Sequence, residues 1–222
     1  MTSTRFRMTL TAIVLTVLVI PAAAEETAWV ALFDGKTLQG WQQQNGTAKY
    51  RVENGTIIGT TNEGSPNSFL CTTKDYADFE LTFEVRVDDA LNSGVQIRSR
   101  STDEIKKGRV HGPQVEIATN GTAGFVYGEA LDTGWLSSDE ARGNPAAKKA
   151  FKRGEWNSYR VKAVGKKIQT WVNGVPIANL VDEKSGMDTG FIGLQVHGIP
   201  KDQGPYKVAW RNIKIRVLSK KQ

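Results

Sequence analysis

Polar side chains recur at alternate positions in three otherwise apolar segments of the chain. The segments NSGVQIRSR, HGPQVEIAT and GFIGLQVHG each hold one such pair: Gln96 with Arg98, Gln114 with Glu116, and Gln195 with His197. Because side chains two positions apart point to the same face of a pleated strand, each pair predicts one polar strand face. Three such strands together predict a groove that carries a carboxylate, an imidazole, a guanidinium and three amides.

These groups suit acid–base chemistry on a bound substrate. Glu116 and His197 are the candidate proton acceptor and donor, and the sequence does not decide which of them is the base. The Arg98 guanidinium is suited to stabilising a developing oxyanion, and the three glutamines are predicted to bind the substrate. The plainer alternative is that Arg98 and Glu116 form a cross-strand ion pair on a solvated face.

Both histidines of the chain, His111 and His197, fall within these polar motifs. Together with Glu116 they could hold a divalent cation, which would serve the same electrophilic role as an arginine. The spacing from His111 to Glu116 is not a recognised metal signature. The sequence therefore predicts no cofactor, with a divalent cation at these three residues as the alternative.

Further candidate substrate contacts lie outside the three polar strands. Tyr127, Trp135 and Lys148 fall in a long insertion between predicted strands, where they would form a wall or lid with aromatic faces for stacking on a substrate. Arg211 shares the strand parity of Ile213 and Ile215 and is predicted as a further groove residue.

The elements that must position these residues are short strands. In DFELTFEVRV, residues 78–87, apolar and polar side chains alternate, which is typical of a half-buried strand. Asn54-Gly55 and Asn173-Gly174 lie between extended runs and predict type I′ hairpin turns. Asn144-Pro145, with Gly154 after a helical run, predicts one short surface helix. The fold class is therefore all-β, a two-sheet antiparallel jelly-roll sandwich.

The N-terminus predicts export. Arg5 and Arg7 precede an apolar run of roughly 13 residues and the small-residue site Ala22–Ala24, which is typical of a signal peptide over residues 1–24 and is shorter than a membrane span. The mature chain, residues 25–222, is expected to be a single periplasmic or secreted domain without a membrane span; a retained N-terminal anchor is the alternative. Cys71 is the only cysteine, so no internal disulfide can form, and we expect it to be buried.

The formal net charge of +6 comes from scattered lysines and arginines, which predicts no nucleic-acid partner. The oligomeric state does not follow from the sequence.

Several motifs occur in an order that resembles a known family. They are LFDGKTLQGW, NSGVQIR, GPQVEI, GEWNSYRV, WVNGV, GFIGLQVHG and WRNIKI, which span residues 32–215. The chain resembles the 3-keto-disaccharide hydrolase family, and the likeness runs from about Trp29 to Val217. The resemblance implies a concanavalin-like, glucanase-type jelly roll in an exported bacterial protein. The stretch IPKDQGPYKVA, residues 199–209, is longer than in many members and is expected to change one groove wall.

The resemblance also implies a reaction. Members act on glycosides whose sugar is oxidised to a ketone at C3, and they cleave them by elimination at C1 after removal of the C2 proton. Here Glu116 or His197 would be the base, and Arg98 would stabilise the enolate.

Two alternatives have different requirements. A non-catalytic carbohydrate-binding jelly roll needs the aromatic side chains but no base. A conventional glucanase needs two carboxylates across the scissile bond, and the predicted groove strands supply only Glu116. Glu129 and Asp132, from a loop, could supply the second carboxylate.

Overall fold

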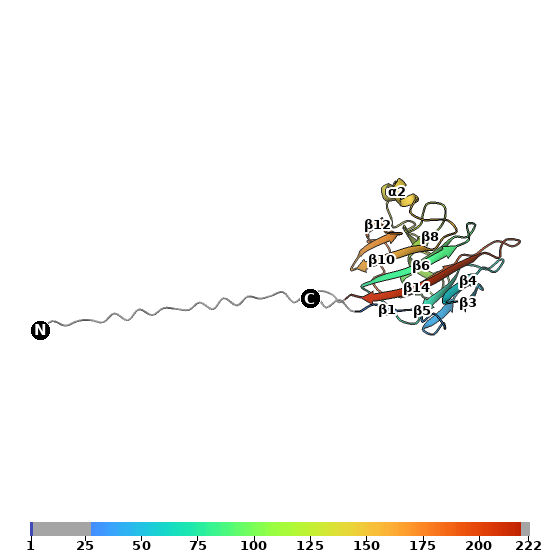
Figure 1. The fold of residues 1–222 in the computed structure, drawn as a ribbon, viewed down its shortest axis with the longest axis horizontal. Helices are drawn as coiled ribbons and strands as arrows, with labels where there is room; N and C mark the ends of the chain where they lie inside the picture. Colours follow the sequence, from blue (N-terminus) through green and yellow to red (C-terminus); the bar gives the residue numbers. More distant parts are fainter. Residues whose placement is uncertain (2–27, 219–222) are drawn as a thin grey trace.

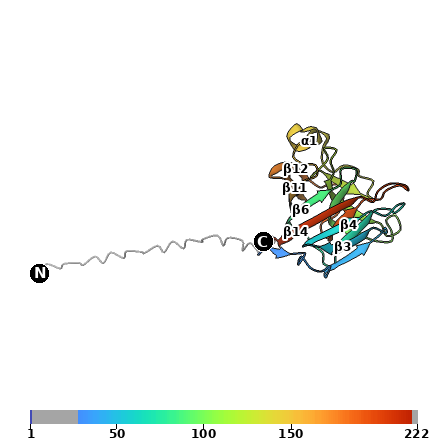
Figure 2. The same cartoon turned by 45° about the vertical axis from the view of Figure 1, so that its right-hand side comes forward.

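The structure, a computed structural model, describes Met1 and residues 28–218. The chain folds into two antiparallel sheets packed face to face (Figures 1 and 2). The prediction of an all-β, two-sheet sandwich is therefore confirmed. The predicted signal peptide lies outside the described residues, apart from Met1.

The larger sheet has eight strands and faces the viewer in Figure 1. Its strands in spatial order are β12 (Val175–Val181), β11 (Lys167–Val172), β10 (Asn157–Val164), β6 (Phe79–Val87), β14 (Lys207–Val217), β4 (Thr56–Thr60) and β3 (Lys49–Glu53), and β1 (Val30–Ala31) pairs with β14. The six-stranded sheet lies behind it in the order β2 (Trp41–Gln44), β5 (Ser68–Thr72), β13 (Phe191–Val196), β7 (Ser93–Ser101), β8 (Val110–Ile117) and β9 (Val126–Glu129).

The predicted alternation of β6 is confirmed and shows how the core forms. Its apolar side chains are buried between the sheets: Phe79, Leu81, Phe83, Val85 and Val87. On the outer face, Thr82 and Glu84 are half-buried and Arg86 is exposed. Glu80 is also on the outer face but is buried there, because Arg160 and Arg216 bind its carboxylate. A strand of period two thus separates an apolar interior from a polar outer surface.

The two predicted Asn-Gly turns are present. Asn54 and Gly55 have φ values of 49° and 72° and connect β3 to β4, and Asn173 and Gly174 have φ values of 49° and 79° and connect β11 to β12. Positive φ at both central residues is the requirement of a type I′ turn, which Asn and Gly meet at low cost.

The single predicted helix is instead two short ones, α1 (Asp139–Gly143) and α2 (Pro145–Lys148). The start of α2 agrees with the prediction, since Asn144 caps it and Pro145 is its first residue. It ends well before Gly154 because Asn157 holds the following segment in a turn: its Oδ1 accepts from the Lys152 N–H at 2.7 Å. No helix in the described part of the chain is long and apolar enough to cross a membrane.

One tyrosine joins the two sheets directly beneath the polar strands. Tyr159 of β10 is buried, stacks on Phe83 with ring centroids 4.9 Å apart, and donates from Oη to the carbonyl of Glu116 in β8 at 3.2 Å. The core therefore fixes the backbone position of the carboxylate singled out in the sequence.

Asn157 is fully buried, and its amide makes two donated and two accepted hydrogen bonds, to Lys152, Glu155 and Asn173. Asn157→Asp keeps the shape of the side chain but removes its N–H groups, so the carbonyls of Lys152 and Glu155 lose their hydrogen bonds. We expect it to lower the free energy of unfolding by about 2 to 4 kcal/mol, measured by urea denaturation. Asn179→Asp, the same change at an exposed strand position, is the control and should have almost no effect. Equal effects from the two variants would contradict this role.

Candidate active site on the six-stranded sheet

Four of the six predicted polar residues gather on the outer face of the six-stranded sheet through the strand register: Gln96, Gln114, Glu116 and Gln195. Gln96 of β7 pairs with Gln114 of β8, and Gly94 pairs with both Glu116 and Gln195 of β13. Gly94 is required there, because a Cβ at this position would lie 2.5 Å from Cδ of Gln114. Its missing side chain leaves the space in which the neighbouring polar side chains meet.

Gln114 is at the centre of a buried hydrogen-bond network. Its Oε1 accepts from Nε2 of Gln96 and from Nε2 of Gln195, both at 2.7 Å, and its Nε2 donates to Oε1 of Glu116 at 2.6 Å. Ser99 donates to Oε1 of Gln96 at 2.6 Å. The donors are therefore aligned in one direction, from Ser99 through two amides to the Glu116 carboxyl group, an arrangement in which each bond strengthens the next.

The Glu116 carboxyl group is adapted to proton transfer. Its burial raises its pKa to about 7, against the opposing effect of the hydrogen bonds from Gln114 and from Asn92, at 3.2 Å, and the nearby charge of Glu129 raises it further. A carboxyl group that exchanges its proton near neutral pH is suited to act as a general base or acid in the same cycle.

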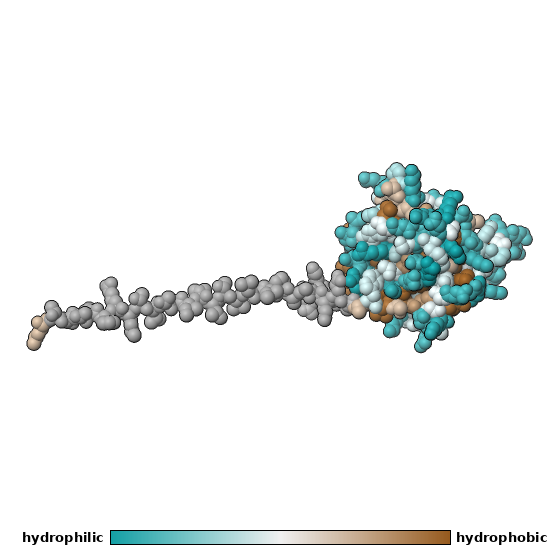
Figure 3. Space-filling view, in the orientation of Figure 1, coloured by the Kyte–Doolittle hydropathy of each residue, from teal (hydrophilic) through white to brown (hydrophobic). Residues whose placement is uncertain are grey.

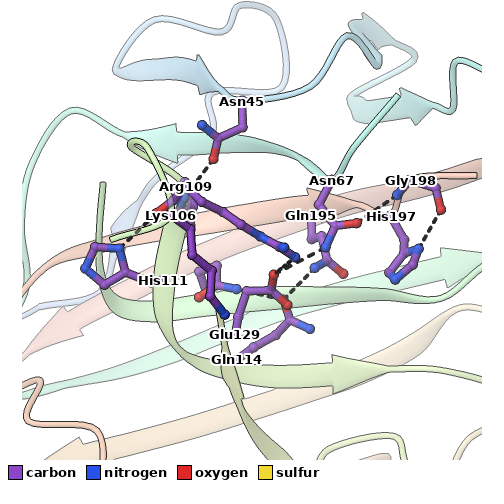
Figure 4. Close-up of polar contacts among 12 residues, drawn as sticks. Asn45, Asn67, Lys106, Arg109, His111, Gln114, Glu129, Gln195, His197 and Gly198 are labelled. Carbon is purple, nitrogen blue, oxygen red and sulfur yellow. Dashed lines mark hydrogen bonds and ion pairs between the residues drawn. The ribbon is translucent and has the colours of Figure 1, made fainter. Parts of the chain in front are cut away.

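A second carboxylate, Glu129, lies on the same face and is paired. Arg109 donates to its Oε1 at 2.6 Å and Asn67 donates to the same atom at 3.3 Å (Figure 4). The Glu129 side chain is 7% exposed, whereas that of Arg109 is 43% exposed. Arg109 therefore neutralises Glu129 and still presents guanidinium N–H groups to a ligand.

Arg109 belongs to the connection between β7 and β8, and one side chain holds it in place. Asn45 donates to the carbonyl of Gly108 at 3.0 Å and accepts from the N–H of Val110 at 2.7 Å, one on each side of Arg109. Lys106, in the same connection, extends alongside Arg109 in Figure 4, with its Nζ 3.9 Å from Asp132.

The sequence reasoning missed Arg109, Lys106 and Asn67. The only available signal for the first two was their position in the hairpin that joins two predicted polar strands.

The two histidines lie in different surroundings. His111 is buried, and its Nδ1 is 2.9 Å from the carbonyl of Arg109. His197 is exposed just beyond the end of β13, with Nδ1 2.7 Å from the carbonyl of Gly198. Among the described residues no three His, Cys, Asp or Glu side chains are placed to hold a metal ion, so His111, Glu116 and His197 do not form the cluster considered above.

The expectation that Arg98 shares a face with Gln96 is wrong. The pairing of β7 with β8 shifts register between Gln96 and Arg100, and Arg98 has a φ of 50°. This irregularity turns the side chain toward the other sheet, where it is 1% exposed and donates to Asp78 at 3.1 Å and to the carbonyls of Ala77 and Gly165. Arg98 therefore has a structural role.

Two predicted substrate contacts also lie elsewhere. Arg211 pairs with Glu84 on the outer face of the eight-stranded sheet, because β14 shifts register between Arg211 and Lys214 and breaks the parity assumed from Ile213. Lys148 is in α2, which packs against β12, and its side chain lies over Gly121. Asp132 is fully exposed, so it is no second catalytic carboxylate.

The predicted aromatic wall lies beside the network. Tyr127 of β9 pairs in register with Gln114, and its ring meets Trp135 edge to face at 5.3 Å. Both rings are half-buried, and the Arg142 guanidinium lies over Trp135. On the other side of the network is an apolar cluster that contains Cys71, whose thiol pKa is raised by burial, as expected for an unreactive cysteine.

Residues 28–216 match the model of the 3-keto-alpha-glucoside-1,2-lyase-like domain, and the chain belongs to this family, as its motifs indicated. The family and the jelly-roll sandwich together indicate a carbohydrate-active protein. No curated protein matches the chain.

Solved structures share the fold at low identity. A candidate glycosyl hydrolase from Parabacteroides distasonis ATCC 8503 is 21% identical over 86% of this chain and 94% of its own, with a TM-score of 0.63. The carbohydrate-binding module CBM66 from Bacillus subtilis is 14% identical over 80% and 95%, with a TM-score of 0.56. A β-glucanase from Bacillus licheniformis is 10% identical over 87% and 99%, with a TM-score of 0.55. These neighbours support the jelly-roll fold.

The structural role of Arg98 can be tested with Arg98→Met. Removing one partner of a buried ion pair leaves Asp78 uncompensated, so we expect a loss of about 3 to 5 kcal/mol in the free energy of unfolding, measured by chemical denaturation. Arg100→Met, at a side chain that is 44% exposed, should cost less than about 1 kcal/mol. An Arg98→Met protein of unchanged stability would contradict this assignment.

The raised pKa of Glu116 predicts a pH-dependent stability. A carboxyl group with a higher pKa in the folded than in the unfolded state binds its proton more tightly when folded, so it opposes folding increasingly as pH rises from about 4.5 to about 7. Glu116→Gln removes this effect and should raise the free energy of unfolding by up to about 3 kcal/mol at pH 8, with little change at pH 4. Denaturation at both pH values measures it, and a gain that does not depend on pH would contradict the shift.

Proposed function

We propose that this protein cleaves 3-keto-glycosides by removing the C2 proton and eliminating the group at C1. The observation that carries the proposal is the Glu116 carboxyl group, buried, with a pKa of about 7, at the end of an aligned chain of amide donors. A ketone at C3 makes the C2 proton acidic enough for one such base. Membership of the lyase-like family supports this reaction class.

In the first step the Glu116 carboxylate accepts the C2 proton. The C–H electron pair becomes the C2=C3 double bond, and the ketone oxygen becomes an enolate oxyanion. Since Arg98 is turned away, the cations available on this face are Arg109 and Lys106, both in the β7–β8 connection. Their positive charge would stabilise the enolate in a partly dry site.

In the second step the enolate re-forms the ketone while the C1–O bond breaks. The electrons form a C1=C2 double bond, which gives an enone, and the departing oxygen takes a proton. That proton comes from the newly protonated Glu116 or from His197, which is exposed beyond β13 and whose neighbour Gly198 donates to Asn67. Addition of water across C1=C2 would complete an overall hydrolysis.

Conventional hydrolysis is the second candidate, because Glu129 is near enough to raise the pKa of Glu116. Two carboxyl groups with separated pKa values can act as acid and nucleophile. The ion pair between Glu129 and Arg109 favours the lyase, because an arginine-bound carboxylate is a weaker nucleophile. A non-catalytic sugar-binding role would not require the amide-bound carboxyl group.

The proposal is tested with a 3-keto-glucoside and the unoxidised parent glucoside, by following aglycone release and enone absorbance. We expect release from the keto form alone, with the enone appearing. Glu116→Gln should lower kcat/KM by about 10²- to 10⁴-fold, and Glu155→Gln, at an exposed position, should not change it.

Other outcomes would decide between the rivals. Cleavage of the parent glucoside alone would overturn the lyase in favour of hydrolysis by Glu116 and Glu129. Binding of sugars without turnover of either substrate would favour the binding module.

The predicted signal peptide leads us to propose that the reaction takes place in the periplasm or outside the cell.

A further inference from the structure

The outer face of the eight-stranded sheet has a depression of about 700 Å³, within the size range of ligand sites. It lies across β11, β10, β6 and β14, on the opposite side of the sandwich from Glu116. Figure 3, which views this face, shows it covered mainly by hydrophilic residues. A polar, indented sheet face is suited to a polar ligand rather than to packing against an apolar partner.

The depression follows from a local break in the sheet. The pairing of β14 with β6 shifts register between Arg211 and Lys214, and Asn212 has a φ of 53°. Two of the outward side chains between this bulge and β11 are short, those of Thr82 and Ser158, while the longer Glu84 and Arg160 side chains line the edges. A bulge beside short side chains thus leaves a hollow in an otherwise regular surface.

One wall of the depression is a partly exposed aromatic ring. Trp171 of β11 is half-buried, and the Arg160 guanidinium lies over its ring at 4.6 Å. Arg160 is itself fixed, since its Nε donates to the buried carboxylate of Glu80 at 3.1 Å. The guanidinium covers one face of the indole and holds the ring in one orientation, and the exposed part of the ring is a flat apolar surface against which a sugar ring can lie.

The opposite wall supplies a cation without a counter-ion. Glu84 is paired with Arg211, and Glu80 with Arg160 and Arg216. Lys214 is exposed and makes no ion pair within the part of the chain that the structure describes. Asn212, two residues earlier on the same strand, offers an amide. An aromatic platform opposite an unpaired ammonium group and an amide matches a sugar that carries a carboxylate.

We propose that this depression is a second carbohydrate site, which binds uronate-containing oligosaccharides and is separate from the polar face of the six-stranded sheet. A sugar ring lies against Trp171, its carboxylate pairs with Lys214, and its hydroxyl groups bond to Asn212 and Glu84. The site makes no covalent change. It would hold the protein on acidic polysaccharide while the opposite face stays open.

The test is isothermal titration calorimetry of the full chain with trigalacturonic acid and with its fully methyl-esterified form, which removes only the charge. We expect the acid to bind at least tenfold more tightly than the ester. Trp171→Ala and Lys214→Met should each weaken binding at least tenfold. Lys49→Met, an exposed lysine of the same sheet outside the depression, and Glu116→Gln should leave it unchanged.

Four results would overturn the proposal. Three are no binding of the acid, equal binding of acid and ester, and wild-type affinity in Lys214→Met. The fourth is loss of binding in Glu116→Gln with wild-type affinity in Trp171→Ala, which would place the acid on the other sheet. Because Lys214→Met alters an exposed side chain, its result stands even where Trp171→Ala fails to fold.

Discussion

The hydrogen bond between Gln114 and Glu116 is the interaction on which the polar face depends. A carboxyl group out of contact with water is costly unless donors replace the lost hydration. Here Gln114 and Asn92 replace it in part, so the group is kept inside and its pKa stays within reach of neutral pH. Without these donors the pKa of the carboxyl group would rise further, because they oppose the effect of burial.

Neighbouring residues of both sheets hold this hydrogen bond in place. Gln96 and Gln195 fix the Gln114 oxygen, so that its nitrogen must point to Glu116. Gly94 provides the space, and Tyr159 anchors the Glu116 backbone from the opposite sheet. Because every member of the network is held by another, the carboxyl group has one orientation before a ligand arrives, which is the preorganisation that catalysis requires.

In both sheets side chains alternate between the interior and the outer face, but the outward side chains differ in kind. On β7, β8 and β13 outward positions carry Gln96, Gln114, Glu116 and Gln195, whose long side chains bind one another and are buried. On β6 and β10 the outward positions carry short or charged side chains, which pair across strands and leave a hollow at the β14 bulge. At the β14 bulge an irregular register creates the hollow, because a regular ladder would place a side chain there.

Much of the architecture could be read from the chain. The alternation in β6 and the Asn-Gly turns act over neighbouring residues, and so they predicted the strands and their connections correctly. The shared polar face of Gln96 and Gln114 was also predicted, since both lie on regular stretches of strand. Arg98 and Arg211 were misplaced because each adjoins a register shift, and a parity count fails beyond a bulge.

By itself, the sequence determined the fold class, the family and the identity of the buried carboxylate, since these depend on local periodicity and on ordered motifs. Only the tertiary structure decided that Arg109 pairs with Glu129, a second carboxylate on the same face. Arg109 reaches Glu129 from the hairpin between β7 and β8. Asn45 holds this hairpin, although it lies more than sixty positions earlier in the chain. Such contacts depend on loop path and sheet register, which side-chain spacing along the chain does not encode.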